Sequence, residues 1–136
     1  AALKAEYTLP GISQSVVITR MAGRTPVPEK ESIRSFAAHQ ATMVLFLSTG
    51  MLEKLSEELV TGGYQEETPA AIVYKATWPE EKVMHCTVGT LAETAEREKV
   101  TKTALIVVGN VLNTEYERSK LYDPAFTTEF RKGKEV

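Results

Sequence analysis

Short runs of apolar, β-branched residues alternate along the chain with segments in which apolar residues recur every three or four positions. The runs have the length and composition of β-strands, and the segments have the spacing of amphipathic helices. Five strands are predicted, at residues 15–19, 42–47, 70–74, 82–88 and 104–108. The second and fifth strands are continuously apolar, which indicates burial on both faces.

Two helices are predicted before the third strand. Ile33, Phe36 and Ala37 place apolar side chains on one face of a helix of about ten residues. Leucines spaced by three and four positions over residues 52–59 form the apolar side of a second helix, which opens near residues 48–50. The two glycines at 62 and 63 are expected to end it, because glycine readily takes a positive φ at a helix C-terminus.

Thr90 and Glu93 have the spacing of a capping box, which predicts a third helix over residues 90–98. Residues 1–6 have the composition of the middle of a helix, and another short helix is predicted after Pro124. These two terminal helices lie outside the alternating part of the chain.

The predicted order, strand–helix–strand–helix–strand–strand–helix–strand, is typical of an α/β layer fold. Buried strands joined through helices favour parallel neighbours, so a mixed, mostly parallel five-stranded sheet flanked by helices is expected. The turn at Trp78 joins two strands directly, which makes that pair antiparallel.

The composition fits one small globular domain. The chain has 136 residues, of which 43% are hydrophobic and 25% charged, enough for one core. Its net charge of -2 argues against a general nucleic-acid binder, which is usually basic. The apolar runs are far shorter than the roughly 20 residues that span a membrane. Because Cys86 is the sole cysteine, no internal disulfide forms, and a reducing, cytoplasmic location is expected.

Several kinds of site are not indicated. Neither Gly-x-Gly-x-x-Gly nor a phosphate-binding Gly-Lys-Ser/Thr loop occurs, so nucleotide binding through these motifs is not predicted. His85 and Cys86 are neighbours in a predicted strand and point to opposite faces, so both are interpreted as ordinary strand residues. No Cys/His cluster has metal-site spacing, and neither a metal ligand nor a catalytic side chain is predicted.

The loops that follow the first three strands are better candidates for a binding site. In open α/β sheets, ligands bind beyond the carboxyl ends of the strands. Residues 20–26, 47–50 and 75–79 combine small or hydroxylated side chains with two arginines and a lysine, which are suited to carboxylate groups. The alternative is that these are ordinary polar loops.

Two of these loops resemble signatures of the tetrapyrrole (corrin/porphyrin) methylases. Residues 19–29, Thr-Arg-Met-Ala-Gly-Arg-Thr-Pro-Val-Pro-Glu, and residues 75–82, Lys-Ala-Thr-Trp-Pro-Glu-Glu-Lys, are similar to loops of the precorrin-4 and cobalt-precorrin-4 methyltransferases of cobalamin synthesis. Residues 41–48 and 103–109 fall where the second domain of this family has equivalent segments. The resemblance extends from residue 9 to residue 122.

The resemblance implies a two-domain enzyme that acts as a homodimer, with S-adenosylmethionine between the domains and the tetrapyrrole in an adjoining trough. The chain resembles only the C-terminal domain, at residues 11–122, between the end of an interdomain connection at 1–10 and a polar tail at 123–136. The Gly-Pro-Gly-Asp and Gly-Gly-Asp-Pro-like loops of the N-terminal domain do not occur. The chain is therefore expected to be a fragment that is inactive alone, with neither a nucleic-acid nor a membrane partner.

The resemblance also assigns candidate contact residues. Those for S-adenosylmethionine are Leu47, Ala76, Ala104 and Leu105. Leu47 stands where relatives often have a methionine near the adenosine, and leucine nearly conserves its volume. Ala76 stands where a small side chain lets the backbone bond the adenine or ribose. The candidates facing the tetrapyrrole are Arg20, Met21, Gly23 and Arg24.

The implied reaction is methylation of ring carbon 11 of precorrin-4 or cobalt-precorrin-4. Because the sulfonium departs as a neutral thioether, alignment of the reacting atoms is the main task, and neither a covalent nucleophile nor a protein-bound metal is required. Two alternatives stay open: another tetrapyrrole methylase, such as a uroporphyrinogen III methyltransferase, and a non-catalytic dimerisation module.

Overall fold

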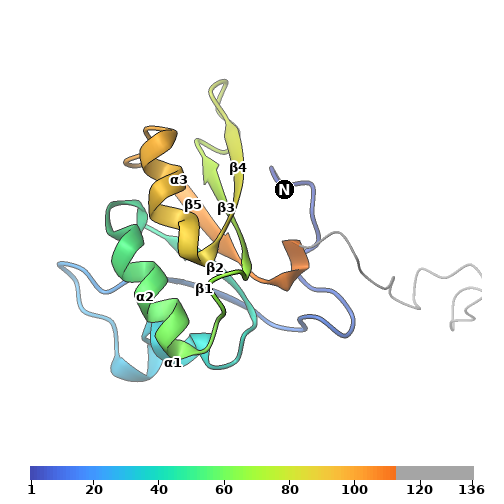
Figure 1. Cartoon of the computed structure of the whole chain (residues 1–136), viewed down its shortest axis with the longest axis vertical. Coiled ribbons are helices and arrows are strands. Elements are labelled where there is room, and N and C mark those ends of the chain that lie inside the picture. Colours follow the sequence, from blue (N-terminus) through green and yellow to red (C-terminus); the bar gives the residue numbers. More distant parts are fainter. Residues whose placement is uncertain (113–136) are drawn as a thin grey trace, which may run out of the picture.

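The computed structural model describes residues 1–112, which contain a five-stranded sheet and three α-helices (Figure 1). The strands are β1 (Val16–Arg20), β2 (Thr42–Phe46), β3 (Pro69–Tyr74), β4 (Lys82–Thr87) and β5 (Ala104–Val108). Each strand begins and ends within one residue of its predicted bounds. The positions of the strands are therefore confirmed.

The sheet is mixed, as predicted, but it is not mostly parallel. Its order is β1-β2-β5-β3-β4, and only β1 and β2 are parallel neighbours; β2–β5, β5–β3 and β3–β4 are antiparallel pairs. The hairpin between β3 and β4 reverses the chain, and the following helix returns it so that β5 runs in the direction of β4. Because β5 inserts between β2 and β3, that single reversal makes three pairs antiparallel.

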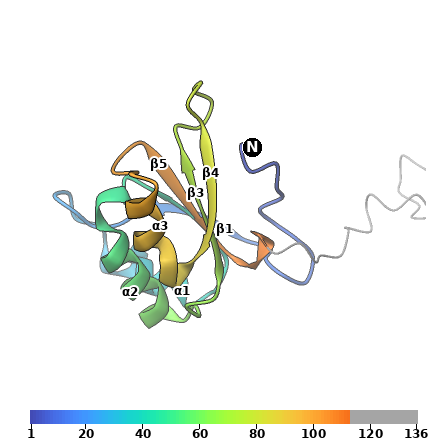
Figure 2. The same cartoon turned by 45° about the horizontal axis from the view of Figure 1, so that its top comes forward.

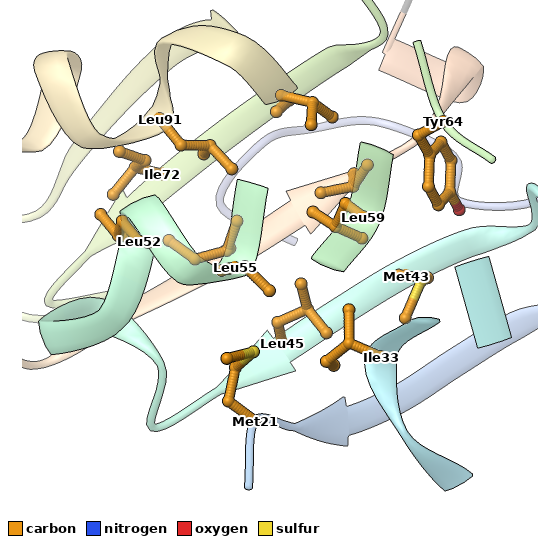
Figure 3. Close-up of a cluster of buried hydrophobic side chains, with 14 of the residues drawn as sticks. Met21, Ile33, Met43, Leu45, Leu52, Leu55, Leu59, Tyr64, Ile72 and Leu91 are labelled. Carbon is orange, nitrogen blue, oxygen red and sulfur yellow. The ribbon is translucent and has the colours of Figure 1, made fainter. Parts of the chain in front are cut away.

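All three helices cover the same face of the sheet, as Figures 1 and 2 show. They are α1 (Ile33–Ala37), α2 (Leu52–Gly62) and α3 (Leu91–Arg97). The core lies between this helical layer and the sheet, where Leu55 and Leu59 of α2 meet Met43 and Leu45 of β2 (Figure 3). These four side chains are fully buried. The predicted helical faces are thus the ones that pack on the sheet.

The two shorter helices begin differently from the prediction. A 3-10 helix at Glu29–Glu31 precedes α1, so α1 has five residues rather than ten. Ser32 is the N-cap of α1, and its Oγ accepts a hydrogen bond from the N–H of Ser35. A 3-10 helix at Val88–Thr90 leads into α3, and the capping box at its start is formed by Thr87 and Thr90, not by Thr90 and Glu93. Thr87 ends β4 in an extended conformation, which is the geometry that an N-cap requires.

The C-terminus of α2 is where the sequence places it. Gly63 has a φ of 132°, and its N–H donates to the carbonyl groups of Leu59 and Val60. Gly62 has a second role, because a Cβ atom at this position would lie 2.5 Å from the Cβ of Ala37. The absence of a side chain lets α2 approach α1 this closely.

Residues 1–6 do not form the predicted helix. The N–H of Lys4 donates to the carbonyl oxygen of Ala1 at 2.9 Å in an isolated turn. This segment lines an apolar pocket with Val44, Val73 and Val107, on the sheet face away from the helices. The helix predicted after Pro124 and the polar tail lie outside the described residues. Over residues 1–112, no helix has the length and apolarity that a membrane crossing requires.

Candidate functional site

An open cleft of about 420 Å³ lies at the edge of the sheet where β2 and β3 end and β5 begins. Its walls come from the segments around Leu47, Ala76 and Ala104. All four residues predicted to contact S-adenosylmethionine line it: Leu47, Ala76, Ala104 and Leu105. The fold therefore brings this whole set together, although its members belong to three separate segments. Their contact with a ligand stays a prediction.

The backbone around the cleft is held in uncommon conformations. Leu47, Lys75 and Thr103 have positive φ values of 53°, 45° and 58°, and all three line the cleft. Residues other than glycine pay a steric cost in this left-handed region, most of all β-branched threonine. The conformations turn the chain sharply out of β2 and β3 and into β5. Strain of this kind concentrates at functional sites, so the cleft is the strongest candidate site in the described chain.

Leu47 and Ser48, the two residues that follow β2, differ in exposure and in role. The Leu47 side chain is 81% exposed, an unusual position for a large apolar group. Ser48 is fully buried; its Oγ accepts a hydrogen bond from the N–H of Met21 and donates one to the carbonyl of Phe46. Ser48 therefore fixes the loop, and Leu47 is the residue that the loop presents to the cleft.

The cleft wall is apolar and positively charged. Phe46, Leu47 and Leu105 supply apolar surface, and Trp78 lies at the margin with 55% of its surface exposed. The charged residues on this wall, among those that the structure describes, are Lys75 and Lys102. Lys75 and Trp78 belong to the loop predicted as a candidate site, whereas Lys102 is one of several cations in a polar loop and has no distinguishing sequence signal.

The four residues expected to face a tetrapyrrole occupy different environments, and none of them lines the cleft. Arg20 donates hydrogen bonds to the carbonyl groups of Met21, Thr25 and Pro26, so its guanidinium group braces its own loop. Met21 is only 4% exposed and packs in the core (Figure 3). Gly23 and Arg24 are exposed. Of the four, these two are the most exposed, Arg20 is partly exposed and Met21 is buried.

His85 and Cys86 lie on opposite faces of β4, as predicted. His85 is exposed, whereas Cys86 packs against the core. Burial raises the pKa of the Cys86 thiol to about 11, although a hydrogen bond from Thr94 and the charge of Arg97 act in the opposite direction. A thiol with so high a pKa is a poor nucleophile near neutral pH. Among the described residues, no three His, Cys, Asp or Glu side chains are grouped to hold a metal ion.

The chain is similar in sequence to known proteins along most of its length. Residues 1–92 match the family model of the tetrapyrrole (corrin/porphyrin) methylases. The chain is 53% identical over 133 residues to a cobalt-precorrin-4 C(11)-methyltransferase of Methanocaldococcus jannaschii, covering 97% of this chain and 51% of the relative. It is 41% identical over 127 residues to a precorrin-4 C(11)-methyltransferase of Mycobacterium tuberculosis, covering 92% and 51%.

The fold is also similar to a solved structure. The X-ray structure of a cobalt-precorrin-4 methyltransferase, a cobalamin biosynthetic enzyme, superposes with a TM-score of 0.80 and 42% sequence identity. The match covers 82% of this chain and 47% of that one. The chain thus spans about half the length of the curated relatives it matches.

Proposed function

The chain belongs to the tetrapyrrole (corrin/porphyrin) methylases, and from this premise we propose that the protein methylates ring carbon 11 of precorrin-4 or cobalt-precorrin-4, with S-adenosylmethionine as the methyl donor. The relatives that match nearly all of the chain carry this activity in their names. The observation that carries the proposal is the convergence of Leu47, Ala76, Ala104 and Leu105 on one cleft.

The cleft has the properties that an adenosyl group requires. Leu47 offers exposed apolar surface for a purine or ribose face, and Leu105 extends that surface. Ala76 and Ala104 have small side chains, so a ligand can approach the backbone closely at this part of the wall. The structure supports these four residues as the part of the donor site that this chain contributes.

S-adenosylmethionine supplies an electrophilic methyl group on a sulfonium, which departs as a neutral thioether. The task of this chain is therefore to hold the donor in line with the ring carbon and to exclude water. Alignment of this kind lowers a barrier by several kcal/mol, up to about 7–11 in the best intramolecular models. The turns at Leu47, Lys75 and Thr103 suit this role, because their positive φ angles direct three segments of the chain around the cleft.

On the substrate side, we assign Gly23 and Arg24 to the tetrapyrrole, because they are exposed on the loop after β1. Arg20 braces that loop through hydrogen bonds, and the buried Met21 anchors it on the core. The proposal extends to the organisation of the enzyme: residues 11–122 form the C-terminal of two domains and residues 1–10 end the connection. The site is completed by an N-terminal domain, within a cytoplasmic homodimer. This chain alone, with half of the cleft, is then inactive.

The test is a methylation assay with the protein as its gene encodes it. Precorrin-4 and cobalt-precorrin-4 are incubated anaerobically with S-adenosylmethionine that carries a 13C methyl group, and NMR locates the new methyl. Label on carbon 11 supports the proposal. Label on another carbon indicates a different tetrapyrrole methylase, and no transfer to any tetrapyrrole overturns the enzymatic assignment in favour of a dimerisation module.

A substitution in the cleft makes the same test specific to this site. Ala76→Leu adds three carbons to the wall and should weaken S-adenosylhomocysteine binding by at least about tenfold, since the inserted volume displaces ligand. Ala38→Leu is the matched control, because Ala38 is exposed at the end of α1. If both variants bind S-adenosylhomocysteine equally well, Ala76 is not part of the donor site.

A further inference from the structure

The charges on the cleft wall are of one sign, although the chain as a whole is acidic. Lys75 and Lys102 are the charged residues that line the cleft within residues 1–112, and no carboxylate lines it there. The net charge of the chain is -2. An apolar cleft whose charges are all positive favours a ligand with an apolar body and a negatively charged group.

Lys75 is the better placed of the two lysines. Its backbone is fixed on both sides, because its N–H donates to the carbonyl of Thr103 at 2.9 Å and its own carbonyl accepts from the N–H of Trp78 at 3.0 Å. Its ammonium group lies 5.4 Å from the centre of the Tyr74 ring and 5.2 Å from that of Trp78. Both distances are within the range of cation–π attraction, so the two rings hold the charge beside the cleft.

The anionic partner of Lys75 within the chain is a weak one. Glu80 lies 3.6 Å from the ammonium group, beyond ordinary hydrogen-bond distance, and its side chain is 60% exposed. The Lys75 side chain is 23% exposed, but solvent reaches the Glu80 carboxylate and screens the pair, which contributes about 1 kcal/mol or less. A ligand carboxylate inside the cleft would be less solvated than Glu80 and would make a shorter, charge-assisted hydrogen bond. Lys75 can therefore exchange Glu80 for a ligand.

We propose that Lys75 is a carboxylate-binding residue of the cleft, which orients the ligand through a charge-assisted hydrogen bond while Tyr74 and Trp78 hold its ammonium group in place. The inference rests on the proposed function. Two ligands of that reaction carry carboxylates: the amino-acid part of the methyl donor and the acetate and propionate groups of the tetrapyrrole. The chemistry at Lys75 is the same for both, and the experiment separates them.

The experiment compares Lys75→Gln with Lys75→Arg in the protein as its gene encodes it. Glutamine removes the charge but is similar in length, and neither substitution introduces a β-branch at this left-handed position. Lys30→Gln removes one charge from the 3-10 helix at Glu29–Glu31, which does not line the cleft, and serves as the control. Calorimetry measures binding of S-adenosylhomocysteine, of its decarboxylated analogue, and of uroporphyrin as a carboxylated tetrapyrrole.

If the carboxylate belongs to the donor, Lys75→Gln weakens S-adenosylhomocysteine binding about tenfold and leaves the decarboxylated analogue unchanged. If it belongs to the tetrapyrrole, uroporphyrin binding weakens by a similar factor and both nucleoside ligands bind as before. In either case Lys75→Arg retains most of the affinity and Lys30→Gln all of it.

Two results overturn the assignment. One is that Lys75→Gln binds all three ligands as the unaltered protein does. The other is that it weakens S-adenosylhomocysteine and the decarboxylated analogue equally, which would show that Lys75 only supports the loop. Both leave the proposed function intact, provided that the unaltered protein methylates its precorrin. An unaltered protein that binds none of the ligands overturns both proposals.

Discussion

The backbone N–H of Lys75 donates a 2.9 Å hydrogen bond to the carbonyl oxygen of Thr103, and both residues have positive φ angles. This bond continues the pairing of β3 with β5 by one step beyond Tyr74 and Ala104. Two strained turns thus stabilise each other at the margin of the cleft. The hydrogen bond therefore links the cleft wall that follows β3 to the wall that precedes β5.

Substitution of Thr103 should reveal the cost of this strain. Asparagine tolerates the left-handed region better than a β-branched residue, and Thr103 is exposed. Thr103→Asn is expected to raise the free energy of unfolding by about 0.5–1 kcal/mol. Urea denaturation measures the change. Thr101→Asn, at an exposed neighbour without a positive φ, is the control and should change little. A loss of stability at Thr103 would show that its side chain has a role beyond the turn.

The close contact of α1 with α2 leads to a second prediction. Gly62→Ala would place a Cβ atom 2.5 Å from Ala37 Cβ and 2.6 Å from the Arg34 carbonyl oxygen. Overpacking of this kind costs about 1–3 kcal/mol, while alanine recovers up to about 1 kcal/mol of helix propensity. We expect a net loss of about 1–2 kcal/mol in chemical denaturation. Gly50→Ala meets no atom within 4 Å and should be nearly neutral. A stabilised Gly62→Ala protein would mean that the two helices move apart readily.

Tyr64 should make the stability depend on pH in the alkaline range. Its buried hydroxyl donates to the carbonyl oxygen of Ala41, and burial raises the pKa of this phenol from 10 to about 12. Because the folded-state value is the higher one, the contribution of the neutral phenol is complete below pH 10 and is lost as the pH rises through 12.

Tyr64→Phe therefore has two expected effects. It removes the hydrogen bond and costs about 1 kcal/mol at neutral pH. It also makes the decline in stability between pH 10 and 12 less steep than in the unaltered protein, which thermal denaturation at a series of pH values can measure. Tyr7→Phe is the comparison, because Tyr7 is 60% exposed. Identical alkaline profiles for Tyr64→Phe and the unaltered protein would assign the decline to other groups.

Trp78 provides a direct report of cleft occupancy. It is the single tryptophan of the chain, and it lines the cleft with 55% of its surface exposed. Binding of S-adenosylhomocysteine should shift its emission to shorter wavelength, because the ligand displaces water from the indole. Trp78→Phe should abolish the signal. Binding that calorimetry detects without any change in Trp78 emission would locate the ligand elsewhere.

The sequence was sufficient for the strands and the helical faces but not for the sheet. Runs such as Ala104–Val108 are recognisable because β-branched and apolar side chains determine both strand propensity and burial. Strand order depends instead on which neighbour a strand meets after a crossover, and nothing local to β5 shows that it lies between β2 and β3. The helix starts were missed for a related reason: Thr87 caps the 3-10 helix that leads into α3 only because β4 ends there.

The structure groups part of the predicted site, while the contacts of its residues with ligands stay predictions. Leu47 and Ala76 were assigned through family resemblance, and the structure brings both to the cleft. Motif position could not show that Met21 is buried, since adjacent residues of a loop can have opposite environments. Nor could it show that Arg20 uses its guanidinium on its own loop, because those hydrogen bonds depend on how the chain folds back at Thr25.

The position of β5 at the middle of the sheet also affects how the domain is made. Within residues 1–112, the β1–β2 pair and the β3–β4 pair have no strand contact with each other, and β5 is the strand that joins them. On the ribosome, β5 is the last of the five strands to emerge. Until it does, each pair exposes an unpaired edge of an apolar strand. Such an edge can pair with another chain, and chaperones can bind it. Translation must therefore pass residue 108 before the nascent sheet can close, and pauses before that point would favour aggregation.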